Sequence, residues 1–462
     1  MTAPLASSRP DPRAGFAVVL AFFGHTRFAK ALTVTVLAAA FGSFALRATI
    51  GWPGLIAVVS ALVLFAALSL IGRWAQLDWH GLLPVSLLVF LGWCVMTMFW
   101  SKYLPSTLNG LAYLLAYAFL GVYIAVVRDL IQIVRAVGDV LRVVLTASLV
   151  LEIIAGVLLD TPIRFLNITG SLAAGGPAQG ILGTRNMLGF VALIAIVTFA
   201  VELATRSVRR GVGVYSVVVA ALCVVLSGSP VTLGVTLVTA LAAVILLALR
   251  RAAPETRRGW HFVLLAVGLL TGSLLFFGRV RVLELLSTRR EFTYRLEIWR
   301  ELGRLIDLNP LEGWGWAGYW RPDVSPFFAL DVIGNRAHTS ALNAFIDVYF
   351  QLGLIGFVIF VGFVGLTVGR AWVLAAAKKS IVYLWLALVL VVLLATSVAE
   401  SAVLVEYGWL LLVICSVKAA RDLSWRVRLR RADEPEPDQP RPPEPGHPRP
   451  QPHPQNSPES TR

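Results

Sequence analysis

Apolar stretches of about 20 residues recur along the chain between short polar connections, and a helix of that length spans the roughly 30 Å hydrocarbon core of a bilayer. The pattern predicts membrane spans at residues 30–46, 54–72, 82–99, 106–127, 138–159, 186–204, 212–227, 231–249, 260–277, 345–369, 382–399 and 405–418. At the polar turn Ser227–Pro230, either a hairpin of two spans or one kinked run is possible. We therefore expect an all-α, polytopic transmembrane helical bundle of about twelve spans.

The apolar stretches divide the chain into three parts. Residues 1–29 are expected to be a cytoplasmic N-terminal segment, in which no short apolar core precedes a small-residue cleavage site, so we expect no removable signal peptide. Residues 30–418 form the transmembrane domain, which includes one long polar loop at 279–344. Residues 419–462 form a Pro-rich, charged tail that is expected to be disordered and cytoplasmic.

Basic residues gather in every second short connection, and this predicts the orientation of the chain. Counted from a cytoplasmic N-terminus, the basic connections all fall on the inside, from Arg73 to Lys379, and the alternate ones are nearly free of basic residues. Cytoplasmic loops are enriched in lysine and arginine, so both termini are predicted to be cytoplasmic and the loop 279–344 exterior. Much of the net charge of +14 follows from this topology, and no nucleic-acid partner is expected.

The exterior loop has an unusual composition, with nine arginines and no lysine between Arg279 and His338. One explanation is a solvated amphipathic helix whose arginines pair with nearby carboxylates. The other is phosphate binding, because the planar guanidinium matches phosphate oxygens in a bidentate way and keeps its charge when partly buried. The absence of lysine favours recognition over solubility alone.

Within this loop, residues 292–308 predict a helix with one apolar stripe, formed by Leu296, Trp299, Leu302, Leu305 and Ile306. Arg295, Arg300 and Arg304 lie on an adjoining face. Asn309 and Pro310 end the helix, and GWGWAGYW follows as a turn rich in glycine and aromatic residues. These aromatic residues suit either the membrane interface or a surface on which a sugar packs.

His338 is the only histidine in the exterior loop and lies a few residues before the next span. A single histidine is often structural, but imidazole has the proton affinity that a general base for a sugar hydroxyl needs. The sequence has no DxD motif and no His, Cys or Asp set with metal-ligand spacing. We therefore expect any transferase chemistry to be metal-independent.

Four further ionisable groups lie in or near the membrane. Arg185 ends the glycine-rich loop 160–185 and is either an interface anchor or another phosphate ligand. Glu400 and Glu406 flank the last exterior turn, and one of them is expected to pair with a loop arginine, since unpaired charges at the membrane face are costly. Glu152 lies inside a predicted span, and the sequence identifies no partner for it.

Three motifs, together with the predicted spans, resemble the O-antigen ligase and O-antigen polymerase family of bacterial membrane proteins. They are GTRNMLG before a span, RLEIWRELGRLIDLNPLEGWGWAGYW in the long loop, and NAFIDVYFQLGLIGF after it. The resemblance covers about residues 30–418 and is strongest at 181–190 and 290–360.

The resemblance implies exterior arginines that bind the pyrophosphate of a lipid-linked glycan, and a catalytic histidine in the large loop. Arg295 in the Arg-x3-Trp element and Arg185 before Asn186 match the pyrophosphate ligands. Many relatives have a histidine directly before the asparagine that aligns with Asn343, where this chain has Leu342. The candidate catalytic residue is therefore His338. The further candidates are Arg300 and Arg336 as pyrophosphate ligands, and Asn186, Trp299, Asn343 and Glu400 as supporting residues.

The function predicted in this way is a membrane glycosyltransferase of the ligase type. It would move a glycan from an undecaprenyl or decaprenyl pyrophosphate to an acceptor hydroxyl, on a glycan, a lipid or another molecule, at the outer face of the bacterial cytoplasmic membrane. The donor bond is already activated, so no cofactor is expected. A polysaccharide polymerase of the same family and a non-enzymatic transporter of lipid-linked glycan are the alternatives. A transporter typically has ionisable residues and broken helices at the bilayer midplane, whereas the polar cluster here is predicted outside.

Overall fold

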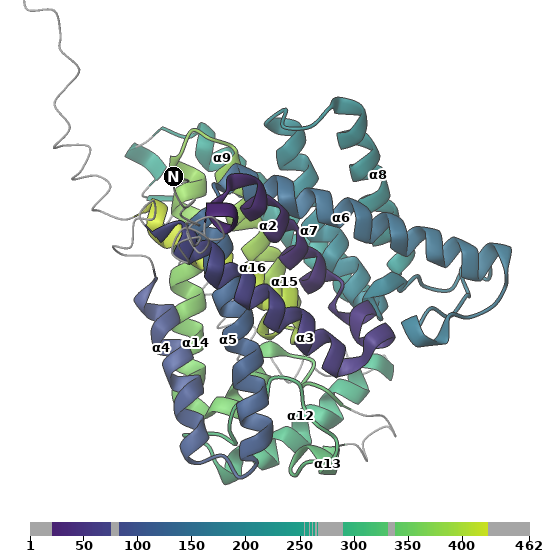
Figure 1. Ribbon diagram of the computed structural model, residues 1–462, viewed down its shortest axis with the longest axis vertical. Coiled ribbons are helices and arrows are strands. Elements are labelled where there is room, and N and C mark those ends of the chain that lie inside the picture. The colour runs from purple at the N-terminus through teal and green to yellow at the C-terminus, as the bar shows by residue number, and fades with distance from the viewer. Residues whose placement is uncertain are drawn as a thin grey trace, which may run out of the picture. The chain divides into compact units, whose positions relative to one another are not determined.

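The structure, a computed structural model, describes residues 21–74, 83–253, 255–257, 259–260, 262–263, 266, 290–330 and 338–423 (Figure 1). These residues form helices and irregular connections without a β-strand, so the all-α prediction is confirmed for the described part of the chain. The α-helices are α2 (Thr26–Phe41), α3 (Ser43–Gly72), α4 (Val85–Met96), α5 (Leu104–Val127), α6 (Leu130–Ile153), α7 (Arg185–Ala204), α8 (Arg210–Ser227), α9 (Pro230–Arg251), α12 (Arg290–Leu308), α13 (Phe327–Leu330), α14 (Ala344–Ala377), α15 (Val382–Ser397) and α16 (Glu406–Asp422).

Seven helices among the described residues are long and apolar enough to cross a membrane, namely α3, α5, α6 with its continuation to Leu158, α7, α8, α9 and α14. The chain is therefore a multi-pass membrane protein. The helices α4 and α15 are also apolar but shorter. The total of about twelve spans stays a prediction, because most of the span expected at 260–277 lies outside the described residues.

The first helices break at positions that differ from the prediction. One break, at Gly42, separates α2 from α3, and a second interrupts α3 at Gly51, whose φ is 70°, directly before Trp52 and Pro53. The sequence had indicated one connection at about 47–53. Proline removes a helical N–H and glycine tolerates this left-handed backbone, so the helix continues beyond a kink rather than ending.

The turn Ser227–Pro230 separates two distinct helices. α8 packs against α7, whereas α9 packs against α15 and α14, so the two do not form one kinked span. In the interior, α16 is buried along its length from Glu406 to Ala419 and packs against α5 and α14. Cys94, Cys223 and Cys415 are all buried, free thiols.

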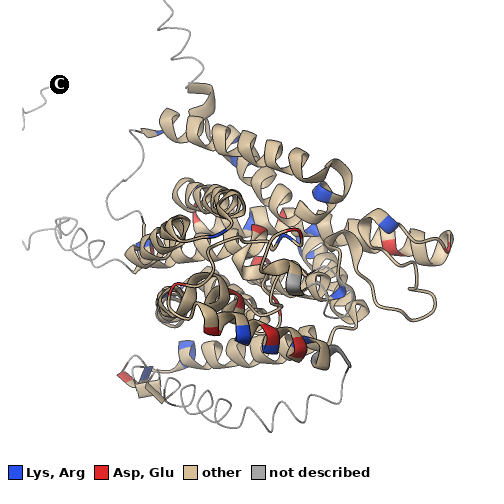
Figure 2. Ribbon diagram, turned by 90° about the horizontal axis from the view of Figure 1, so that it is seen from below, with Lys and Arg blue, Asp and Glu red and all other residues tan. Residues whose placement is uncertain are grey.

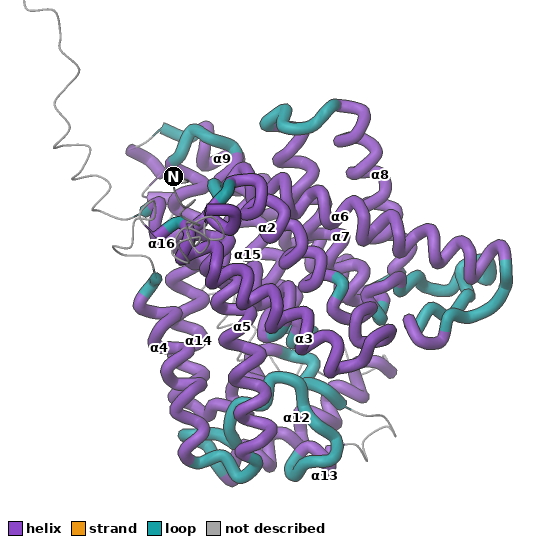
Figure 3. Tube along the Cα trace, in the orientation of Figure 1, coloured by secondary structure: helices purple, strands orange, loops and turns teal. Residues whose placement is uncertain are grey.

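The helices α12 and α13 lie together at one end of the helical unit, where several long connections also gather (Figures 1 and 3). We call this the α12 end. α5 also begins at this end. Tyr103, the residue directly before α5, donates its hydroxyl to the carbonyl of Gly315 at 3.1 Å. The helix predicted at 292–308 corresponds to α12, which begins two residues earlier, at Arg290, and ends at Leu308 as predicted.

The turn after α12 inserts into a break in α14. Gly353 in α14 has φ 67°, so the helix is interrupted there and nearby main-chain carbonyls can accept hydrogen bonds from outside the helix. The amides of Trp314 and Gly315 donate to the carbonyls of Phe350 and Gln351 at 3.1 and 2.8 Å. A β-carbon on Gly353 would lie 2.1 Å from the carbonyl oxygen of Leu311, so only glycine permits this approach. The motifs GWGW and QLGLIG are therefore two halves of one junction.

Candidate functional site

Two polar side chains of α14 hold the neighbouring loops in place. The Oδ1 atom of Asp347 accepts hydrogen bonds from Trp320 Nε1 at 3.0 Å and from Gln351 Nε2 at 2.7 Å, and its Oδ2 accepts from the amide of Ala341 at 3.2 Å. Gln351 Oε1 accepts from the amides of Ala317 and Gly318 at 2.7 and 3.0 Å. These buried bonds fix both the segment before α14 and the GWGWAGYW turn, which is a supporting function.

α12 packs on this platform through one apolar face. Ile298, Leu302 and Ile306 are buried in a cluster with Trp320, Phe327 and Phe350, and Trp299 and Leu305 flank it. The predicted stripe is thus confirmed in part, but Ile298 rather than Leu296 lies at its centre. Basic and acidic residues alternate on the remaining surface of α12 (Figure 2).

Arg295 reaches from α12 to two other segments. Its Nη1 donates to the carbonyl of Leu342 at 2.9 Å and to the carbonyl of Ala399, and its Nη2 donates to Glu400 Oε1 at 3.1 Å. The side chains of Arg295 and Glu400 are only 12% and 11% exposed. This ion pair confirms the expected pairing of Glu400 or Glu406, which flank the turn between the last two helices, with an arginine of the long loop.

Asn186 binds the same carboxylate from the start of α7. Its Nδ2 donates to Glu400 Oε1 at 2.7 Å, and its Oδ1 accepts from Ser229 Oγ at 2.7 Å. Burial raises the pKa of the Glu400 carboxyl above its ordinary value, although the adjacent Arg295 and Asn186 oppose the shift. The structure thus brings together two predicted site residues that lie 109 positions apart in the sequence, Asn186 and Arg295, around Glu400.

Two more predicted residues, Asn343 and Trp299, contact segments in this region. Asn343 caps α14, with its Oδ1 accepting from the amides of Phe345 and Ile346 at 3.0 and 3.1 Å, and its Nδ2 donates to the carbonyl of Val398 at 2.9 Å. Trp299 Nε1 donates to the carbonyl of Ala341 at 2.9 Å. Leu342, directly before Asn343, is in a left-handed conformation with φ 52°, which is uncommon for leucine.

His338 is buried beside the first turns of α12. Its Nδ1 lies 2.9 Å from the hydroxyl of Tyr294, and the residue is 5% exposed. Tyr294 precedes Arg295, so one turn of α12 contributes both the contact to His338 and the contact to Glu400. The sequence did not indicate the role of Tyr294, because a tyrosine on a helix face has no motif of its own.

The other predicted arginines differ in how far they are buried, and one lies outside the described residues. Arg185 is the first residue of α7, next to Asn186, and is half-buried. Arg300 is exposed on α12. Arg304 forms an exposed ion pair of 2.8 Å with Glu301, which fits a solvated helix face. Arg336 lies outside the described residues.

The glycine-rich loop before α7 supplies the partner that the sequence did not identify for Glu152. The amides of Gln179 and Gly180 donate to Glu152 Oε1 at 2.6 and 2.8 Å. Thr184 Oγ1 then accepts from the amide of Met187 and caps α7. The loop therefore closes onto α6 and fixes the start of α7, where Arg185 and Asn186 lie.

A second arginine–carboxylate pair at the α12 end was not predicted as a site. Arg47 from α3 donates to Glu406, and Tyr113 from α5 donates to the same carboxylate at 3.0 Å. Arg47 directly follows an apolar run and shortly precedes Trp52, and that position at the end of a predicted span was the available signal.

The arrangement offers cationic and amide donors around a carboxylate of raised proton affinity, and a buried imidazole contacts the same turn of α12. Such groups can bind an anion and accept a proton. Among the described residues, no group of three or more His, Cys, Asp or Glu side chains is arranged to hold a metal ion.

Comparison with known proteins supports the family resemblance. Residues 215–361 match a family model described as O-antigen ligase, a range that covers α12, the GWGWAGYW turn and the start of α14. No curated protein matches the chain. The match confirms, over these residues, the resemblance to the O-antigen ligase and O-antigen polymerase family of membrane proteins.

Proposed function

We propose that the protein is a glycosyltransferase of the ligase type. It transfers a glycan from undecaprenyl or decaprenyl pyrophosphate to an acceptor hydroxyl at the outer face of the bacterial cytoplasmic membrane. The observation that carries this proposal is the convergence of Asn186 and Glu400 on Arg295, which lies in the range 215–361 that matches the O-antigen ligase family model.

In the proposed reaction, the acceptor oxygen attacks the anomeric carbon of the donor sugar, and the bond from that carbon to the pyrophosphate oxygen breaks. His338 takes the proton of the attacking hydroxyl. The pyrophosphate leaves on its polyprenyl chain with the electron pair of the broken bond. Both the bond made and the bond broken involve oxygen, so no oxidant, nucleotide or metal is required by the balance of the step.

Arg185, Arg295, Arg300 and Arg336 are the proposed ligands of the pyrophosphate. Negative charge develops on the leaving group, and preorganised donors in a water-poor site can each lower such a barrier by several kcal/mol, on the order of 3. Arg295 is held by Glu400 in the structure, so phosphate oxygens would replace Glu400 on its Nη2. The raised proton affinity of Glu400 favours this exchange, because a protonated carboxyl releases the guanidinium more readily.

The test is transfer by purified protein in detergent, with a fluorescent disaccharide on undecaprenyl pyrophosphate as donor. We expect release of undecaprenyl pyrophosphate that depends on an added acceptor glycan. Growth of the donor glycan on itself, without another acceptor, would identify a polymerase instead. Binding of the donor without any bond cleavage, under conditions that support folding, would contradict the enzyme and favour a transporter.

A further inference from the structure

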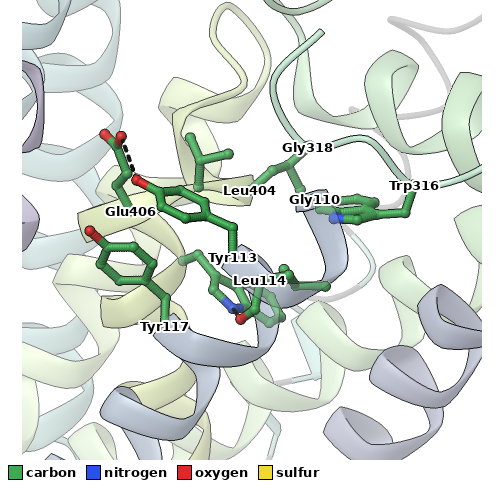
Figure 4. Close-up of a pocket in the computed structure, with 10 residues that line it drawn as sticks. Gly110, Tyr113, Leu114, Tyr117, Trp316, Gly318, Leu404 and Glu406 are labelled. Carbon is green, nitrogen blue, oxygen red and sulfur yellow. Dashed lines mark hydrogen bonds between the residues drawn. The ribbon is translucent and has the colours of Figure 1, made fainter. Parts of the chain in front are cut away.

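The pair formed by Arg47 and Glu406 is held more firmly than a surface ion pair. Glu406 is 4% exposed and accepts hydrogen bonds from Arg47, from Ser43 and, at 3.0 Å, from the hydroxyl of Tyr113 (Figure 4). Its backbone is left-handed, with φ 48°, which is uncommon for glutamate. The three donors come from α3 and α5, so the carboxylate of α16 fixes the position of the Arg47 guanidinium at the α12 end.

Two aromatic rings, those of Trp52 and Tyr319, enclose the Arg47 guanidinium, and we call these three side chains the stack. The guanidinium carbon of Arg47 lies 4.8 Å from the ring centroid of Trp52 and 4.8 Å from that of Tyr319. The two ring centroids are 5.6 Å apart at an interplanar angle of 70°. Tyr319 belongs to the GWGWAGYW turn, and Trp52 follows the break in α3 at Gly51. Trp52 is 45% exposed, so part of its ring faces outward from the stack.

A small pocket adjoins the stack and contains a polar atom without a partner. Its lining includes Gly110, Tyr113, Trp316, Gly318 and Glu406 (Figure 4). Trp316 is 1% exposed, and its Nε1 has no hydrogen-bond acceptor in the described part of the chain. A buried N–H is costly unless it is bonded, so this atom favours an oxygen that enters the pocket.

We propose that the Arg47–Trp52–Tyr319 stack and the adjoining pocket bind a sugar ring of the glycan substrate. The exposed face of Trp52 packs against the C–H face of the ring, and the Arg47 guanidinium, which Tyr319 helps to hold in place, bonds its hydroxyl groups. A ring hydroxyl or a water bound to it accepts from Trp316 Nε1. The identification of the ligand as glycan rests on the function proposed above.

The alternative explanation is that Trp52 only anchors α3 at the membrane interface, as exposed tryptophans commonly do. An anchor does not require a guanidinium fixed between two rings or a donor left unbonded in the neighbouring pocket. In addition, Trp314 and Trp320 of the turn bond acceptors within the protein. Trp314 Nε1 donates to the carbonyl of Leu305 at 2.9 Å, and Trp320 Nε1 donates to Asp347 Oδ1 at 3.0 Å. Tyr319 is therefore the residue of the turn that contributes to the stack.

A binding test that does not depend on transfer uses the full-length protein in detergent micelles with free glucose, galactose, mannose and N-acetylglucosamine. Saturation-transfer NMR should show magnetisation passing from the protein to ring C–H protons of at least one sugar. The signal should disappear in Trp52→Ala and weaken in Tyr319→Phe. Trp74→Ala is the matched control, an exposed tryptophan directly beyond the other end of α3, and it should keep the signal. No signal from wild type, or an equal signal from Trp52→Ala, overturns the proposal even if transfer activity is present.

Kinetic measurements distinguish the donor glycan from the acceptor glycan as the source of the ring. If the acceptor binds here, Trp52→Ala should raise the KM for acceptor by about tenfold and leave the KM for the lipid-linked donor unchanged. A rise confined to the donor would assign the site to the donor glycan. Unchanged constants for both substrates, in a variant with normal thermal stability, would contradict a substrate site.

Discussion

Arg295 and Glu400 form an ion pair of 3.1 Å that joins α12 to the connection between α15 and α16. Both side chains are nearly buried, and Arg295 also donates to two main-chain carbonyls. Removing one partner from a buried pair typically costs about 3–5 kcal/mol, because the other charge stays buried without compensation. The pair therefore stabilises the site as well as being a candidate for binding phosphate, and a single substitution affects both.

A double-mutant cycle separates these two effects. We expect Arg295→Ala to lower the apparent melting temperature and abolish transfer, and Arg295→Ala with Glu400→Gln to regain stability without transfer. Arg295→Lys should also lose most activity, since an ammonium cannot replace the planar fork. Arg304→Ala, on the exposed face of the same helix, is the control and should be near normal. If the double variant transfers as well as Glu400→Gln alone, Arg295 has only a structural function.

The raised pKa of Glu400 predicts a pH dependence of stability. A carboxyl whose pKa is higher in the folded protein than in the unfolded chain stabilises the fold at low pH. That contribution is complete below the unfolded pKa and is lost as pH rises through the folded pKa. We expect the apparent melting temperature of wild type to fall over this range, and the fall to be smaller in Glu400→Gln.

Melting curves of both proteins across this pH range provide the measurement. Glu301→Gln, a substitution at a more exposed carboxylate of α12, should leave the wild-type profile unchanged. Identical profiles for wild type and Glu400→Gln would show that Glu400 does not titrate in the folded protein over this range.

The sequence predicted the helices well because membrane spans are long and apolar, and their length requirement is physical. It also identified three site candidates. Arg295 was found through a motif, Asn186 through its position at a span boundary, and Glu400 through the cost of an unpaired charge. It could not predict that all three meet. That meeting depends on tertiary packing, in which the α15–α16 connection and α12 approach each other from positions 105 residues apart.

Other features were not predictable for local reasons. In the sequence, Arg47 only follows the end of an apolar run. Its stack with Trp52 and Tyr319 depends on the kink at Gly51 and on a turn that lies far along the chain. The partner of Glu152 is the backbone of a loop, and backbone amides have no sequence signature. The apolar stripe of α12 was displaced because Ile298 and Leu296 are equally apolar, and only packing determines which is buried.

The orientation of the α12 end is tested by labelling single cysteines in intact cells. Asp323→Cys in the long loop should react with a membrane-impermeant maleimide added outside, because residue 323 is exposed. Glu255→Cys, also exposed but in a connection predicted to be cytoplasmic, should react only after lysis. The native cysteines are buried and should give little background. The opposite labelling pattern would place every candidate site residue on the cytoplasmic side and remove the proposed function.

The junction between the GWGW turn and α14 should not tolerate a side chain at residue 353. Gly353→Ala has both a backbone conformation that costs a non-glycine residue about 1–3 kcal/mol and a contact of 2.1 Å with the Leu311 oxygen. We expect a lower melting temperature and a large loss of transfer. Gly362→Ala in the same helix is the control, because a β-carbon there meets nothing within 4 Å. Equal stability of the two variants would mean that the turn can leave α14 without consequence.

Transfer should depend on the imidazole of His338 and, less strongly, on its contact with Tyr294. As a general base, His338 has to accept the hydroxyl proton, so His338→Ala should abolish transfer at normal protein level and with donor binding retained. His338→Gln should not rescue, because an amide hydrogen-bonds but does not take a proton. Tyr294→Phe removes the hydroxyl that lies 2.9 Å from Nδ1, and we expect transfer to fall roughly tenfold through loss of orientation.

Tyr349→Phe is a suitable control for Tyr294→Phe, because Tyr349 packs against the same apolar cluster and its ring pairs with that of Phe357, with the centroids 5.7 Å apart. Its transfer rate should be close to that of wild type. Transfer and donor binding should be measured together in all four variants, because the combination separates the possible functions of His338. Loss of both in His338→Ala would assign the imidazole to pyrophosphate binding. Near-normal transfer by His338→Gln would limit His338 to orienting the acceptor, and Glu400 would then be the next candidate for the base, since its raised proton affinity is that of a group able to accept a proton.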